Sequence, residues 1–231
     1  MKRFAVKHPI LFEAILIIVS FILVIIASIP LQALYFSNEV TTSLARILVG
    51  GFLFIVFLYC FKLKKQFSSF PIILPGLLFV LWNVANCFMT GGSVNMPDMF
   101  MFIEAAAPAI FEEIIFREIF IYHLKENGRK DLEVVLIAAV VFSLIHLTNV
   151  VGGNLIQTLV QTGYSLVVGL FFSAVYVKSD DLFSLIILHG LIDFSSRIFV
   201  GASSTPFYVL FLFAILLIIE TLYSLWLTRK K

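Results

Sequence analysis

Ionisable side chains recur at regular spacing inside three apolar segments of this chain. The first segment carries two glutamates and an arginine, the second a histidine, and the third a histidine and an aspartate: Glu112, Glu113, Arg117, His146, His189 and Asp193. A carboxylate can take a proton from water, and a histidine can accept, hold or donate one. Together the three segments supply the groups needed to activate a water molecule.

The two adjacent glutamates are predicted to have different roles. Successive residues of an α-helix point about 100° apart, so Glu112 and Glu113 cannot both face one partner. Glu113 and Arg117 have i,i+4 spacing with the acid N-terminal to the base, which favours an ion pair. Glu112 is then left as the free carboxylate. The alternative interpretation is that all three side chains form a packing network.

The histidines belong to two further motifs, Phe-x-x-x-His from Phe142 to His146 and His-x-x-x-Asp from His189 to Asp193. Asn149 follows His146 by three residues and extends the same helical face. His189, Asp193 and Arg197 are spaced four apart, so Asp193 can accept a hydrogen bond from His189 and fix the tautomer of that ring, or it can pair with Arg197. The alternative is a histidine that serves only as a hydrogen-bonded packing residue.

The composition as a whole is that of a membrane protein. Of 231 residues, 61% are hydrophobic and 13% are charged, against roughly 45–50% and about 25% in soluble domains. These values exclude a disordered chain, a nucleic-acid binder and a water-soluble enzyme. The apolar runs are continuous and do not alternate, which excludes a transmembrane barrel. We therefore predict an all-α fold, a polytopic transmembrane helical bundle.

Eight apolar runs approach the length of about 20 residues that a spanning helix needs. They are Ile10–Ile29, Leu44–Phe61, Phe70–Phe88, Met99–Tyr122, Leu132–Leu147, Leu155–Val177, Leu182–Val200 and Phe207–Leu227. We predict one membrane domain over residues 1–231, with its motif-bearing core at 99–200. Cys60 and Cys87 lie inside apolar runs and are predicted to be small core residues and not a disulfide.

The basic residues predict the orientation of the spans. Thirteen of the 16 Lys and Arg residues lie at the two termini or in the second, fourth and sixth loops, and the alternate loops hold none. The positive-inside rule then places both termini in the cytoplasm. In this orientation the polar residues converge in the central-to-outer part of the bilayer. Glu13, Arg46 and Glu220 lie nearer span ends and are predicted to be interfacial anchors or helix–helix contacts.

A charged side chain at the centre of a span costs roughly 2.5–3.5 kcal/mol on insertion scales. Such residues therefore face inward, pair with each other or line a wet cavity, and they mark functional sites. A transporter or proton relay is one alternative for such residues. No inverted repeat is visible in the sequence, which argues against it.

In order, Glu-Glu-x-x-x-Arg, Phe-x-x-x-His and His-x-x-x-Asp on three separate spans resemble the CAAX-protease and bacteriocin-processing family, also called CPBP or Abi. This family includes the type II CAAX prenyl endopeptidases. The resemblance covers residues 112–193. It implies an intramembrane protease of glutamic or metalloprotease-like type, which hydrolyses a peptide bond in a membrane-associated peptide or protein.

The resemblance also implies roles for the motif residues. Glu112 and His146 would hold and deprotonate the attacking water, and His189 with the residue at Asp193 would stabilise the oxyanion. Supporting positions would be Glu113, Arg117, Phe142 and Asn149. The endopeptidase branch has asparagine where this chain has Asp193, and a carboxylate donates no hydrogen bond unless it is protonated. We therefore expect Asp193 to orient His189 instead.

No cofactor is predicted, although a catalytic zinc is the alternative. In that version Glu112, His146 and His189 would bind zinc, and Glu113 would be the base. The expected partners are the lipid bilayer and a membrane-associated peptide or protein substrate, with no nucleic acid. The abundance of Phe, Ile and Lys is typical of a bacterium with an AT-rich genome. We therefore predict that the protein lies in a bacterial plasma membrane. A non-catalytic immunity or scaffold protein of the same fold is the alternative function.

Overall fold

The computed structural model describes residues 2–34, 36–61, 73–151, 153–202 and 205–229. The predicted all-α class is confirmed, since helices form nearly all of the described chain. Five of the basic residues counted above and the start of the third predicted span lie outside the described residues: Lys62, Lys64, Lys65, Lys230, Lys231 and positions 70–72. The side chain of Cys60 lies outside them as well, whereas Cys87 is buried as predicted.

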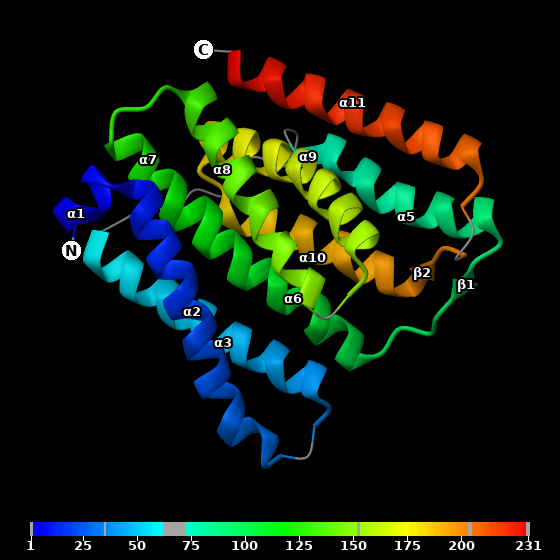
Figure 1. Cartoon of the computed structure of the whole chain (residues 1–231), viewed down its shortest axis with the longest axis horizontal. Helices are drawn as coiled ribbons and strands as arrows, with labels where there is room; N and C mark the ends of the chain where they lie inside the picture. The colour runs from blue at the N-terminus through cyan, green and yellow to red at the C-terminus, as the bar shows by residue number, and fades with distance from the viewer. Residues whose placement is uncertain (1, 35, 62–72, 152, 203–204, 230–231) are drawn as a thin grey trace.

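The helical elements follow the order of the predicted spans (Figure 1). They are α1 (Lys2–Lys7), α2 (Pro9–Gln32), α3 (Asn38–Phe61), η1 (Leu74–Gly76), α5 (Leu77–Thr90), α6 (Met99–Glu113), η2 (Ile114–Ile121), α7 (Tyr122–Glu126), α8 (Asp131–Ile145), η3 (His146–Val151), α9 (Leu155–Ser179), α10 (Leu182–Ile198) and α11 (Phe207–Arg229). Two short strands, β1 (Ser93–Val94) and β2 (Phe199–Val200), pair antiparallel.

The chain is an integral membrane protein. Five described helices are long and apolar enough to cross a membrane, namely α2, α3, α8 with η3, α9 and α11, and α5 is apolar but shorter. Large apolar side chains point outward from these helices; Ile18 and Ile25 of α2, for example, are 60% and 64% exposed. Such a surface is stable against lipid. The helices α6 and α10, which carry Glu112, Glu113, His189 and Asp193, pack against each other in the interior of the bundle (Figure 1).

The close packing of α8 against α9 depends on Gly169. A Cβ atom at this position would lie 3.1 Å from the Cα atom of Ala139 and 3.1 Å from the ring of Phe142. Small residues let helix backbones approach in this way inside membranes. The absent side chain therefore fixes where the end of α8 lies, and with it the position of His146.

Contacts between loops define the two ends of the bundle. At one end Asn127 donates a hydrogen bond to the carbonyl oxygen of Val6 (2.8 Å), and Lys178 lies 3.7 Å from Asp131. The N-terminal segment and the fourth and sixth loops therefore share this basic end. The paired strands β1 and β2 join the third and seventh loops elsewhere, away from the basic end (Figure 1). That the basic end faces the cytoplasm stays a prediction.

Two of the acidic residues near span ends do not reach the membrane surface. Glu13 on α2 and Glu220 on α11 are both fully buried. The interfacial-anchor interpretation is therefore wrong for them, and they lie at helix–helix contacts, which was the other interpretation. Apolar span ends gave no sequence signal of which face of each helix turns inward.

Candidate active site

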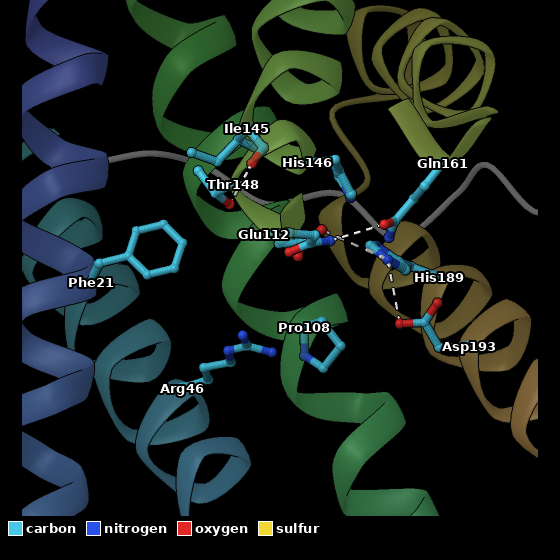
Figure 2. A pocket seen from close by; sticks show the side chains of 11 residues that line it. Phe21, Arg46, Pro108, Glu112, Ile145, His146, Thr148, Gln161, His189 and Asp193 are labelled. Carbon is cyan, nitrogen blue, oxygen red and sulfur yellow. Dashed lines mark hydrogen bonds and ion pairs between the residues drawn. The ribbon is translucent and has the colours of Figure 1, made fainter. Parts of the chain in front are cut away.

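All four predicted catalytic side chains line one cavity of about 320 Å³ (Figure 2). Its walls come from seven elements, and its lining residues are Phe21, Arg46, Pro108, Glu112, Ile145, His146, Thr148, Asn149, Gln161, His189 and Asp193. The volume lies at the lower end of the range for small-molecule sites. The three motifs, separated in sequence, thus meet around a single space.

The two adjacent glutamates occupy different environments, as their helical spacing predicts. The side chain of Glu112 lines the cavity and is 22% exposed. Glu113 is fully buried, and its Oε1 lies 3.0 Å from Nη1 of Arg117, which is also fully buried. The predicted Glu113–Arg117 ion pair is confirmed. Glu112 is the one of the two that can meet a water in the cavity.

Aromatic rings complete the surroundings of Arg117. Its guanidinium carbon lies 4.1 Å from the ring centre of Phe142 and 5.3 Å from that of Phe172. The contact with Glu113 lacks hydrogen-bond geometry and is electrostatic. Cation–π contacts strengthen when the cation is desolvated. Phe142 of the Phe-x-x-x-His motif therefore packs against Arg117. Phe172 does so too, and no sequence motif predicts it.

A π-helix follows directly after the two glutamates. It covers Ile114–Ile121, and all eight of its side chains are buried. Such i→i+5 turns are rare and frequently occur at functional sites. Within it the carboxylate of Glu118 accepts a hydrogen bond from the hydroxyl of Tyr176 (2.7 Å). This segment contains no glycine or proline, so none of its residues predicts the wider turn.

His189 is held by Glu113 and not, as expected, by Asp193. Its Nδ1 donates to Oε1 of Glu113 over 2.8 Å, because a carboxylate can only accept. The other ring nitrogen, Nε2, lies 3.7 Å from Asp193 and 4.0 Å from Glu112. The expectation that Asp193 fixes the tautomer of His189 is corrected: Glu113 does so from α6. Asp193, 32% exposed at its side chain, faces the cavity.

The ring of His146 is held by a backbone carbonyl and not by a carboxylate. Its Nδ1 lies 2.8 Å from the carbonyl oxygen of Phe142. A carbonyl only accepts, so Nδ1 carries the hydrogen and Nε2 of the neutral ring keeps its lone pair. The α-helix ends at Ile145, and His146 begins the 3-10 turn η3. Asn149, in the same turn, donates to Gln161 of α9 (3.0 Å).

Several residues around the cavity carried no recognisable signal in the sequence. Arg46 was predicted to be an anchor or a helix–helix contact, but it lines the cavity together with Glu112. Gln161 lines the cavity from α9. Arg197 pairs with Glu104 (2.8 Å). Arg46 and Gln161 belong to no short motif, because each reaches the site through the packing of separate helices. Arg197 continues the i,i+4 stripe of His189 and Asp193, but its ion pair is with Glu104.

The zinc alternative requires Glu113 as the base. Glu113 is fully buried between Arg117 and His189, so it does not face a water in the cavity. Among the described residues, no group of three or more His, Cys, Asp or Glu side chains is arranged to hold a metal ion. In this arrangement Glu112, His146 and His189 share the cavity without forming a ligand set.

The fold and the cavity define a helical membrane protein with buried carboxylates and histidines contributed by α6, η3 and α10. The family model described as type II CAAX prenyl endopeptidase Rce1-like matches residues 94–195. The match contains all three motifs, and it supports membership of this chain in the CAAX-protease (CPBP) family, a family of proteases. No curated protein and no solved structure matches the chain.

Proposed function

We propose that this protein is an intramembrane endopeptidase that hydrolyses a peptide bond in a membrane-associated peptide or protein. The observation that carries the proposal is the shared cavity of Glu112, His146 and His189. It combines a partly exposed carboxylate, an imidazole with a free Nε2 and a second imidazole held in place from behind. These are the groups that water activation and charge stabilisation need.

The chemical step follows from these positions. A water between Glu112 and His146 loses a proton to Glu112 while its oxygen bonds to the scissile carbonyl carbon. His189, when its Nε2 carries a hydrogen, donates to the oxyanion that forms on the carbonyl oxygen. The carbon–nitrogen bond then breaks, and Glu112 returns the proton to the leaving amine. Water is the only co-reactant, and the products are a carboxylic acid and an amine.

Glu113, Arg117 and Phe142 would be positioning residues in this scheme. Glu113 holds the Nδ1 hydrogen of His189, and Arg117 lies beside Glu113 and against the ring of Phe142. None of the three lines the cavity. Their part is to fix the orientation of His189 before the substrate arrives, which lowers the reorganisation needed during the reaction.

A second cavity indicates how the substrate lies. It has a volume of about 510 Å³, shares Gln161 and Asp193 with the first cavity and is lined otherwise by mainly apolar residues, including Trp82, Tyr164 and Phe213. An apolar side chain or acyl chain of the substrate would fit there. This arrangement favours a substrate that reaches the site from the membrane.

A non-catalytic immunity or scaffold protein of the same fold is the second candidate, because the family also has non-catalytic members. The contacts of Glu113 with Arg117 and His189 favour it in one respect, since they join α6 to α10 whether or not a reaction occurs. The partly exposed Glu112 has no part in those contacts, and a scaffold gains nothing from it.

Hydrolysis itself can be measured in purified proteoliposomes. A panel of acylated peptides would be incubated with the protein in ¹⁸O-labelled water, and the products analysed by mass spectrometry. We expect cleavage of at least one peptide with one ¹⁸O atom in the new carboxylate, and none with Glu112→Gln. Cleavage that persists unchanged in Glu112→Gln would contradict the proposal, and a functional assay in cells that both forms pass equally would favour the scaffold.

A further inference from the structure

Arg46 is a cation in the cavity that has no ion-pair partner among the described residues. The other arginines near the site are engaged, since Arg117 pairs with Glu113 and Arg197 pairs with Glu104. Arg46 makes no ion pair or side-chain hydrogen bond with any residue in the part of the chain that the structure describes. In Figure 2 its guanidinium points from α3 towards Pro108 on α6.

The position of Arg46 links two spaces. It lines the cavity that contains Glu112, and it also lines a neighbouring cavity of about 380 Å³. This 380 Å³ cavity is bounded by the first residues of α3, by Glu104 near the start of α6 and by Arg197 near the end of α10. These are the helix ends opposite the basic loops. Arg46 and Pro108 border both cavities, so a substrate reaching Glu112 from this side passes the guanidinium.

A guanidinium binds a carboxylate through two parallel N–H···O hydrogen bonds and keeps its charge in apolar surroundings. We propose that Arg46 binds a carboxylate group of the peptide substrate and thereby positions the scissile bond beside Glu112. This inference rests on the proposed function. The two residues share a cavity of about 320 Å³, which holds only a short stretch of peptide. Cleavage therefore occurs within a few residues of the carboxylate.

The carboxylate has two possible sources, the C-terminus of the peptide or an acidic side chain. Three probes separate them, each an acylated, fluorescent octapeptide with otherwise uncharged residues. The first has a free C-terminal acid, the second a C-terminal amide, and the third an amide with one Asp near the end. Binding would be measured to the Glu112→Gln protein in nanodiscs of phosphatidylcholine, so that no turnover interferes and no anionic lipid competes.

We expect the free acid or the Asp-containing amide to bind about 10-fold or more tightly than the plain amide, which is the scale of a charge-assisted hydrogen bond. Whichever probe gains identifies the source. Adding Arg46→Gln should remove the difference. Adding Arg197→Gln, which removes the same charge from the neighbouring cavity, should keep it. Arg46→Lys should retain only part of it, because an ammonium lacks the planar fork.

Equal binding of all three probes, or a preference that survives Arg46→Gln, would overturn the inference. So would an effect of Arg46→Gln confined to nanodiscs with phosphatidylglycerol, which would assign Arg46 to a lipid phosphate. Because binding is measured without turnover, the endopeptidase proposal can fail separately. If the wild-type protein cleaves none of the probes while the binding pattern holds, the carboxylate site stands and the reaction is wrong.

Discussion

His189 donates its Nδ1 hydrogen to Glu113 over 2.8 Å, although the two residues lie 76 positions apart on different helices. The same carboxylate oxygen lies 3.0 Å from Arg117. Glu113 therefore connects the cation of η2 to the imidazole of α10, and it is buried away from the cavity. The second glutamate of the Glu-Glu motif is in a position to act through His189 and not on a substrate.

Glu113→Gln should lower kcat and leave KM nearly unchanged. The amide oxygen can still accept from Nδ1, but the negative charge that opposes Arg117 and steadies His189 is lost. Steady-state kinetics on a cleaved peptide would measure the split, and ¹⁵N NMR of the imidazole would report the altered hydrogen bond. A change in KM alone, with an unaltered His189 signal, would contradict the positioning role.

Arg117→Ala should lower the abundance of folded protein more than it lowers turnover per folded molecule. Removing one partner of a buried ion pair costs about 3–5 kcal/mol, and the change also removes the cation between Phe142 and Phe172. Fluorescence-detected size-exclusion chromatography would measure the folded yield. The matched control is Lys125→Ala at the basic end, where the side chain of Lys125 is 33% exposed. A normal yield for Arg117→Ala would argue against the pair.

Peptide cleavage should need no metal ion. The base of the zinc alternative, Glu113, does not reach the cavity, and Glu112 is available as a base without a metal. Purified protein would be analysed for bound metal and then assayed after a chelator and after zinc is restored. Stoichiometric zinc, whose removal stops cleavage and whose return restores it, would overturn this prediction.

The site should open towards the outer half of the membrane. Asn149 lines the cavity, and Asn154 caps the start of α9, at the helix end opposite Lys178 of the basic end. Cysteine introduced at either position, in a Cys60/Cys87-free protein, should react with a membrane-impermeant thiol reagent on intact cells. A cysteine at exposed Glu126, at the basic end, should react only after lysis. The opposite pattern would reverse the topology and place the cavity mouth on the cytoplasmic side.

Local contacts of the site could be predicted from the sequence, and contacts between helices could not. Glu113 and Arg117 lie on one continuous helix, where i,i+4 spacing decides the pairing. The bond from Glu113 to His189 and the place of Arg46 depend on how α3, α6 and α10 pack. Small rotations of these helices change which side chains meet. The same limit explains why the sequence predicts Asp193 as the partner of His189: it is the nearer residue in sequence.

The buried face of each helix could not be predicted for a similar reason. Apolar residues occur all around the helices of a membrane protein, so hydrophobic periodicity no longer identifies the buried face. The fold class followed from composition and run length, which do not depend on orientation. The burial of Glu13 and Glu220 does depend on the orientation of their helices, so it could not be predicted.

The central claim is that Glu112 activates the water. Single-turnover cleavage of one identified peptide should be measured for Glu112→Gln, Glu113→Gln and, as a matched control at the start of α8, Glu133→Gln. We expect Glu112→Gln to fold normally and lose about 10²-fold or more, the scale of a general base. Glu133→Gln should match the wild type, and Glu113→Gln should retain measurable turnover. Full activity of Glu112→Gln, with Glu113→Gln inactive, would contradict this account.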